Sequence, residues 1–395
     1  MRSCSVFISL LLALLSSSPV EGHWTKKAEL NLKLKNGSKT EISIQKASAI
    51  ESLRGGGNAR KVERGGNNKK IEKVVTPVKV VPAESKLLYN LRIGSYFFLW
   101  YSLNVGYNYH NKKTLNMISA PLTLSALQLV VGVVYVGLLW LFRLRSAPGL
   151  SIENIKVLNP IGFCHAASHL SAVVGLGAGS VSFAHIVKAM EPFFTALFSA
   201  IFLKQFFPLP VYASLIPVVA GVALASLKEL NFSIVALGGA MGSNVAAASR
   251  AILAKKSMSA PKGTNMGPAN LYGVLTIIAT IVLVPIAAIL EGPKIMALWD
   301  AAVSKGFAGE LITRHALLSG LYFYLYNEVA FLALDAVHPV VHAVGNTLKR
   351  VFVIASGVIL FGNQITPLGL VGSALAIVGV LVFSLVKEYY SNKKV

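Results

Sequence analysis

The sequence predicts an all-α integral membrane protein, and three observations lead to this fold class. Of the 395 residues, 54% are hydrophobic and only 13% are charged, whereas a soluble domain carries about 25% charged residues. Ten apolar stretches of spanning length follow residue 87. The last two stretches of each half also resemble one another. We therefore expect ten transmembrane helices, arranged as two inverted five-helix repeats.

The N-terminal part of the chain is predicted to be a targeting segment rather than a folded domain. Arg2 precedes the apolar run 6–15 and a group of small residues, so residues 1–22 have the layout of a secretory signal peptide. Residues 23–86 are basic and without apolar periodicity, which predicts a disordered segment. A signal peptide followed by a transit segment resembles the presequences of algae with complex plastids. We therefore expect a plastid envelope membrane, reached through the secretory route.

The formal net charge of +21 does not indicate nucleic-acid binding, because of where the basic residues lie. Residues 1–86 hold 16 of the 37 Lys and Arg, and most of the others flank the apolar stretches. We expect the lipid bilayer to be the macromolecular environment, with no nucleic acid and no obligatory protein partner. The two cysteines, Cys4 and Cys164, offer no disulfide framework.

The transporter domain is predicted to cover residues 87–390, with a short tail at 391–395. Its predicted spans are 88–109, 119–142, 157–177, 179–203, 209–227, 231–254, 270–290, 314–334, 338–361 and 366–387. The connections are short except 143–156, 255–269 and 291–313, so no soluble domain is inserted. An even number of spans places both termini on one side. Lys and Arg are more numerous in the loops of that side, which predicts the cytosol-like, stromal face.

The internal repeat is visible when the fourth and fifth stretches are laid on the ninth and tenth. His185 then matches His342, and Pro210 matches Pro367. After one-residue shifts, Gly221 matches Gly379, and further on the dipeptide at 228–229 matches that at 387–388. Copies that are five spans apart have opposite orientations in the membrane. Inverted repeats with a site at their interface are a transporter architecture.

Four cations stand out within the predicted spans, namely Lys188, Arg250, Lys349 and Arg350. A charged residue at the centre of a bilayer helix costs about 2.5–3.5 kcal/mol. Two acids are near in sequence, so Lys188 could pair with Glu191, and Arg350 with Glu328. Four cations against two acids still leave a surplus of positive charge. This surplus predicts a water-accessible cavity for an anion, with a compact phosphate as the natural candidate.

Other polar side chains in the spans have a structural alternative as well as a functional one. Tyr322 and Tyr326 lie one turn apart and could be packing residues. His165 and His169 have the spacing of a metal pair, but no third ligand is apparent, so we expect ordinary packing and no metal or cofactor.

The segments SVSFAHIVKAMEPFF, LYNEV and HAVGNTLKRVFVI, together with SRAILAKK and SYFFLWYSLNVGYNYHNKK, closely resemble those of the plastid phosphate translocators, especially the triose-phosphate/phosphate branch. The resemblance covers about residues 88–390. It implies the ten-helix drug/metabolite transporter fold and strict exchange of phosphate for phosphorylated three-carbon compounds. The phosphate ligands that it implies are His169, Lys188, Tyr326, Lys349 and Arg350. Candidates for a secondary site or gate are Arg250, Glu191, His185, His342, Tyr322 and Ala247.

The chain departs from the family pattern at the expected organic end of the pocket. Ala172 stands where a hydroxyl is expected one turn past His169, and Ser171 lies beside it. Ala247 stands three residues before Arg250, where the relatives carry a bulky or amide side chain. Small residues here predict a wider pocket.

The sequence therefore predicts an obligate antiporter of phosphate and phosphorylated C3 metabolites that performs no covalent chemistry. Within transporters, the alternatives are exchangers of phosphoenolpyruvate, pentose phosphate or hexose phosphate, and nucleotide-sugar transporters. An anion channel would carry flux without a counter-substrate, and an intramembrane enzyme would need a nucleophile or metal constellation.

Overall fold

The computed structural model describes residues 86–230, 232–257 and 263–393. The chain divides near residue 86 into two units, and residues 87–395 form the second. The predicted signal peptide and nearly all of the basic segment 23–86 lie outside the described residues. Within the described ranges every regular element is a helix, apart from one isolated bridge between Gly149 and Thr264.

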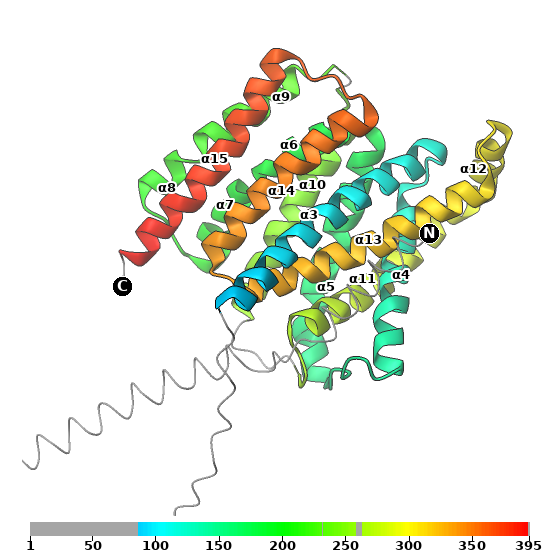
Figure 1. Ribbon diagram of the computed structural model, residues 1–395, viewed down its shortest axis with the longest axis horizontal. Coiled ribbons are helices and arrows are strands. Elements are labelled where there is room, and N and C mark those ends of the chain that lie inside the picture. Colours follow the sequence, from blue (N-terminus) through cyan, green and yellow to red (C-terminus); the bar gives the residue numbers. More distant parts are fainter. Residues whose placement is uncertain (1–85, 231, 258–262, 394–395) are drawn as a thin grey trace, which may run out of the picture. The chain divides into compact units, whose positions relative to one another are not determined.

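Each of the ten predicted stretches is helical along most of its described residues (Figure 1). The helices of the first half are α3 (Lys86–Met117), α4 (Pro121–Leu141), α5 (Ile152–Ala178), α6 (Val181–Val187), η1 (Lys188–Met190), α7 (Glu191–Leu203), α8 (Leu209–Ala213) and α9 (Ile216–Leu227). Those of the second half are α10 (Ile234–Lys256), α11 (Pro268–Leu290), α12 (Gly292–Ser304), α13 (Gly309–Ala336), α14 (Pro339–Phe361) and α15 (Pro367–Asn392).

Most of the helices begin where the sequence supplies a cap or a proline. The side chains of Ser180, Ser233 and Thr366 accept hydrogen bonds from the first-turn amides of α6, α10 and α15. Pro121 and Pro268 stand in the first turn of α4 and α11, where a missing N–H is no loss.

Two of the predicted spans are interrupted by proline. Pro192 cannot donate to the carbonyl of Lys188, and the chain passes from α6 through the 3₁₀ turn η1 into α7 at this point. Pro217 stands in the same relation to Ala213, the last residue of α8. The fourth and fifth spans are therefore each two helices in line, with a break near the middle.

The expectation of a plain connection at 291–313 is wrong, because residues 292–304 form α12. This 13-residue helix is too short to span a bilayer, and so it gives no spanning signal in the sequence. Among the described helices, eight segments are long and apolar enough to cross a membrane. The charged helices α3 and α10 are long enough, with 32 and 23 residues, but less apolar.

The helix contacts follow the two-fold relation expected of a duplicated chain. In this relation α4 corresponds to α11, and α5 corresponds to α13. Accordingly, α4 packs on α13 as α11 packs on α5. The fifth spans of both repeats, α9 and α15, pack closely on each other.

Glycines at the α9–α15 contact show the same relation at the level of single residues. Gly221 lies against the backbone of Gly372 and Ala376, and Gly379 lies against the backbone of Val218. Gly221 and Gly379 are 158 positions apart, as are Val218 and Ala376. The two repeats therefore make the same contact in both directions, and the matching of Gly221 with Gly379 predicted from the sequence agrees with it.

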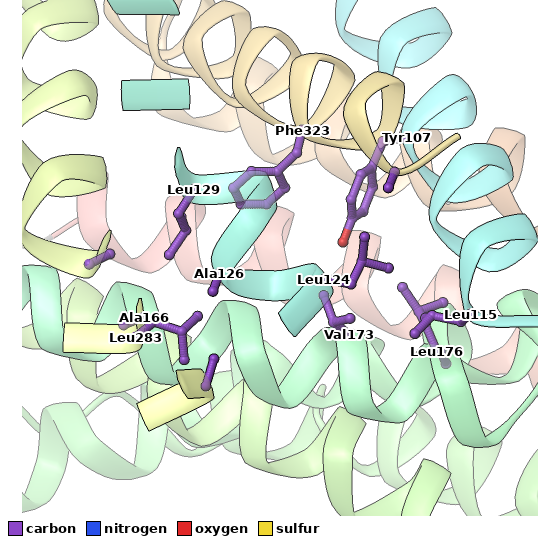
Figure 2. Packing of buried hydrophobic residues seen from close by; sticks show 14 of the residues in the cluster. Tyr107, Leu115, Leu124, Ala126, Leu129, Ala166, Val173, Leu176, Leu283 and Phe323 are labelled. Carbon is purple, nitrogen blue, oxygen red and sulfur yellow. The ribbon is translucent and has the colours of Figure 1, made fainter. Parts of the chain in front are cut away.

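The larger buried cluster lies among α3, α4, α5, α11 and α13 (Figure 2). Tyr107 and Phe323 face each other within it, with ring centroids 5.4 Å apart. A second cluster joins α6 to α9, α10 and α15. The interrupted fourth span lies between these two clusters, and it carries Lys188 and Glu191.

Candidate functional site

The break in the fourth span determines where Lys188 and Glu191 lie. Lys188 is the first residue of η1 and Glu191 is the first residue of α7. The Asn244 side chain on α10 donates to the carbonyl oxygen of Val187 at 2.9 Å. This bond anchors the end of α6 to α10, immediately before Lys188.

Lys188 is held by a serine hydroxyl of α10, which in turn contacts a serine of α5. Its ammonium donates to Ser243 Oγ on α10 at 2.6 Å. Ser243 Oγ lies 3.3 Å from Ser168 Oγ on α5, and Ser168 Oγ donates to the Ser243 carbonyl oxygen at 3.1 Å. The predicted pairing of Lys188 with Glu191 is not formed, since among the described residues the ammonium is bonded to Ser243.

Glu191 instead binds Arg350 of α14, with Nη2 and Oε2 3.1 Å apart. The Arg350 side chain is 6% exposed and that of Glu191 is 34% exposed. Pairing of Arg350 with Glu328 is also not formed. Glu328 makes a two-pronged ion pair with Arg145, at 2.5 and 3.2 Å, in which its side chain is fully buried.

Lys349 lies beside Arg350 but contacts an aromatic group. Its ammonium is 4.9 Å from the centre of the Trp100 ring on α3. His342, one of the predicted gate residues, stacks on the same ring with a centroid distance of 4.8 Å. A cation–π contact uses the face of the ring and offers no acceptor oxygen to the three N–H donors of the ammonium, so the Lys349 ammonium remains available to an anion.

These side chains form one electrostatic cluster. The positive charges of Arg350, Lys188, Arg250 and Lys349 all act on the Glu191 carboxylate. Because Glu328 is neutralised by Arg145, the cluster holds four cations and one carboxylate. The surplus of positive charge is therefore larger than the sequence predicted.

Aromatic and imidazole rings border the cluster on the side of α13. Tyr326 packs against Tyr107 and Phe323, with centroid distances of 5.4 and 5.7 Å. His169 lies 3.9 Å from the Phe323 ring centre. Arg250 donates from Nη1 to His165 Nδ1 at 2.9 Å. The His165 ring also stacks on Phe323, with centroids 6.3 Å apart, and the absence of a metal at the two histidines stays a prediction.

Two of the predicted gate residues have other neighbours. His185 Nε2 lies 3.0 Å from Asn108 Oδ1 on α3. Tyr322 stacks on His110, and the His110 and His315 Nδ1 atoms are 2.7 Å apart. The His185 contact joins α6 to α3, and the contacts of Tyr322 and His315 join α13 to α3.

The small residues of the predicted organic end differ in exposure. Ala247 is buried on α10, one turn from Ser243 and three residues from Arg250. Ala172 and Ala246 are partly exposed. That these alanines widen the pocket stays a prediction.

Sequence reasoning missed Ser243, Ser168 and Trp100, which hold or border the two lysines. Serine in a glycine-rich stretch such as ALGGAMGSN gives no distinct signal, since it is also common at close helix contacts. Trp100 lies in an aromatic run where several rings could be the partner. The ion pair of Arg145 with the buried Glu328 was also not predicted, since Arg145 lies in the connection 143–156.

A comparison with known protein families shows to which family a chain with this arrangement belongs. Residues 91–384 match the model of the Triose-phosphate Transporter family. The chain belongs to this family. It is accordingly a membrane transporter rather than an enzyme.

Curated members of the Triose-phosphate Transporter family match most of the chain. The triose phosphate/phosphate translocator of Zea mays is 41% identical over 306 residues, which are 76% of this chain and 72% of that protein. The glucose-6-phosphate/phosphate translocator 2 of Arabidopsis thaliana is 38% identical over 75% of this chain and 76% of its own length. The phosphoenolpyruvate/phosphate translocator 2 of the same plant is 36% identical, over 82% and 85%. All three are named as chloroplastic proteins.

Proposed function

We propose that this protein is an obligate antiporter that exchanges inorganic phosphate for phosphorylated three-carbon compounds, such as triose phosphate and 3-phosphoglycerate. The observation that carries the proposal is the cluster of four cations around one carboxylate inside the helical domain. A phosphate group supplies about two negative charges and several acceptor oxygens. It can therefore compensate the surplus that the protein leaves unpaired.

Unsatisfied nitrogen atoms support the same ligand. In the described part of the chain, Arg350 Nε and His169 Nε2 are buried without a hydrogen-bond partner. A buried donor without an acceptor costs about 1–3 kcal/mol. Phosphate oxygens would satisfy these atoms, with Arg350 binding two oxygens and Lys188 and Lys349 acting as point charges. Tyr326 would border the phosphate from α13.

A hexose-phosphate exchanger is the second candidate, and a specific observation favours it. The relatives named for triose phosphate, glucose 6-phosphate and phosphoenolpyruvate are between 36% and 41% identical to the chain, so identity does not separate them. Ala172 and Ala247 have small side chains, and we expect them to leave room beside the phosphate cluster. A larger sugar phosphate would use that room.

We place the protein in a plastid envelope membrane, since all three named relatives are chloroplastic. The predicted signal-plus-transit layout of the N-terminal segment adds the secretory route of a complex plastid. A fluorescent fusion of residues 1–86 in such an alga should enter the plastid, and retention in the endoplasmic reticulum would contradict the route.

The function is tested by exchange in proteoliposomes. Vesicles loaded with phosphate are offered labelled triose phosphate, 3-phosphoglycerate, phosphoenolpyruvate, pentose phosphate or glucose 6-phosphate. We expect the three-carbon compounds to exchange fastest. Ala247→Phe should reduce the exchange of glucose 6-phosphate relative to triose phosphate. Exchange of a nucleotide sugar without exchange of phosphate would contradict the proposal.

A further inference from the structure

A cavity of about 290 Å³ lies between α7, α14 and α15, and we call it the C-terminal cavity. Its inner end is formed by Glu191 and Arg350, and its lining on α15 runs from Val380 to Ser391. Eleven residues of helix rise about 16 Å at 1.5 Å per residue, which is about half of a ~30 Å hydrocarbon core. The cavity therefore extends from the phosphate cluster toward the C-terminal end of the domain.

The lining of the C-terminal cavity is a polar stripe on otherwise apolar helices. On α15 the stripe repeats at the i, i+3, i+4 and i+7 positions and consists of Ser384, Lys387, Glu388 and Ser391. Other faces of α15 expose apolar residues, such as Val378, Val382 and Leu385. On α14, Asn346 and Arg350 are one turn apart and both line the cavity. Polar stripes on membrane helices face water or a ligand rather than lipid.

The acids of the C-terminal cavity have cationic or imidazole partners, whereas Lys387 lies on aromatic rings. Glu191 binds Arg350, and Glu388 lies 3.6 Å from His338 Nε2. The Lys387 ammonium is 5.1 and 5.6 Å from the ring centres of Phe207 and Phe383. Among the described residues, no carboxylate is within ion-pair distance of it.

A second ammonium group adds positive charge at the outer end. Lys255 of α10 donates to Gln205 Oε1 at 2.6 Å, and its charge acts on Lys387 together with the opposite charge of Glu388, which His338 shares. The outer end of the cavity thus offers attraction to an anion. At the inner end, Arg350 is already bonded to Glu191 through Nη2.

We propose that the C-terminal cavity is a second anion-binding position, in which the phosphate group of the substrate is held by Lys387 before it reaches Arg350. The inference rests on the proposed function. Asn346 provides amide donors between the two cations, one turn before Arg350. The volume corresponds to about ten waters at ~30 Å³ each, so a phosphate with a three-carbon chain fits together with some of its hydration water.

The experiment measures the KM for inorganic phosphate separately on the two faces of the membrane. Proteoliposomes are sorted on a C-terminal affinity tag, so that the C-terminus faces outward in all of them. Labelled phosphate is varied on one face while the other face is saturated. For Lys387→Ala we expect the KM on the C-terminal face to rise about tenfold, with the KM on the opposite face and the maximal rate unchanged.

The duplicated chain supplies a matched control. Lys228 is the repeat equivalent of Lys387 and is exposed at the end of α9. Lys228→Ala should leave the KM on the C-terminal face unchanged, and Lys387→Arg should restore it. Ser384→Leu, which fills the cavity without removing a charge, should raise the KM on the C-terminal face alone.

Several outcomes would overturn the second position. These are an unchanged KM for Lys387→Ala, or an equal change on both faces. A lipid headgroup as occupant is tested with vesicles that contain or lack anionic lipid. If Lys387→Ala removes only a dependence on anionic lipid and leaves the phosphate KM unaltered, the cavity binds lipid instead. If wild-type protein exchanges no phosphate at all, the proposed function fails, which is a separate result.

Discussion

At the scale of single residues, we expect phosphate binding to require the positive charge of both Lys349 and Arg350. At Arg350 it should also require the planar guanidinium. Removing either cation leaves part of a phosphate dianion unpaired in a site of low dielectric constant, which costs about 3 kcal/mol or more. Lys349→Ala and Arg350→Ala should therefore lower phosphate exchange by at least about a hundredfold. Arg350→Lys should fail similarly, because a point charge cannot make two-pronged contacts.

The measurement is exchange in proteoliposomes, normalised to folded protein from size-exclusion chromatography. Lys156→Ala is a suitable control, since Lys156 is a 68% exposed cation that pairs with Glu153 on its own helix. Near-normal uptake by Lys349→Ala would exclude that residue from the phosphate site.

Ser243 is expected to act through Lys188 rather than by binding phosphate itself. Ser243→Ala removes the hydroxyl that accepts from the Lys188 ammonium at 2.6 Å. A hydrogen bond to a charged group contributes about 1.5–3 kcal/mol, so the KM for phosphate should rise between about ten- and a hundredfold. The maximal rate should change less, because the charge remains.

Ser249→Ala is the matched control for Ser243→Ala. Ser249 lies on the same helix, and its hydroxyl donates only to the carbonyl of Val245 within that helix. Phosphate kinetics of Ser249→Ala should equal those of the wild type. A positioning role for Ser243 would be wrong if both serine variants behaved alike.

The sequence allowed the charged residues to be identified but not their partners. Lys188, Lys349 and Arg350 stand out because each is a cation inside an apolar stretch. Their partners come from distant parts of the chain, and Arg145 and Glu328 are 183 positions apart. Side-chain pairing depends on helix rotation and packing, which the sequence does not show. The two alternatives considered from the sequence, Lys188 with Glu191 and Arg350 with Glu328, are therefore not the ion pairs that the structure forms.

At the scale of elements, the contact between α9 and α15 depends on glycine. A Cβ on Gly221 would lie 2.6 Å from the carbonyl oxygen of Gly372, and the neighbouring backbone cannot move independently. Overpacking of this kind costs about 1–3 kcal/mol. Gly221→Ala should therefore lower the thermal unfolding temperature in detergent.

Gly137→Ala on α4 is the same chemical change without the contact. A Cβ on Gly137 meets nothing within 4 Å, and alanine is favoured over glycine in helices by up to about 1 kcal/mol. This variant should unfold at the same temperature as the wild type or higher. A similar loss in both variants would show that glycine at 221 is not required for packing.

The long elements were predictable because a spanning helix needs about 20 apolar residues, a signal that few other structures give. The breaks at Pro192 and Pro217 follow from local chemistry, but the sequence reading did not place them, since it treated each apolar run as one helix. Helix α12 was missed because it is short. Its 13 residues are too few to span a bilayer, and its apolar surface is used for packing through Leu298 and Trp299.

At the scale of the whole molecule, the charge cluster connects binding with exchange. The ligand-free protein holds four cations against the single carboxylate of Glu191. Closing a cavity over such a cluster removes unpaired charge from water, at several kcal/mol per ion. Bound phosphate supplies the missing negative charge. The closed state through which the carrier must pass is then accessible only when it is loaded.

This mechanism predicts strict one-for-one exchange. It also predicts that Glu191→Gln lowers the residual uptake of phosphate into empty vesicles. Vesicles preloaded with phosphate should take up labelled phosphate rapidly, while vesicles without internal substrate should take up almost none. Glu191→Gln removes the one carboxylate that the described residues place in the cluster, so the small residual uptake into empty vesicles should fall further. Glu328→Gln, which changes a carboxylate that belongs to Arg145, should not reduce that residual uptake. Substantial wild-type uptake into empty vesicles would show that the unloaded carrier returns freely. In that case the cations would serve binding alone, and the coupling of the two substrates would need another cause.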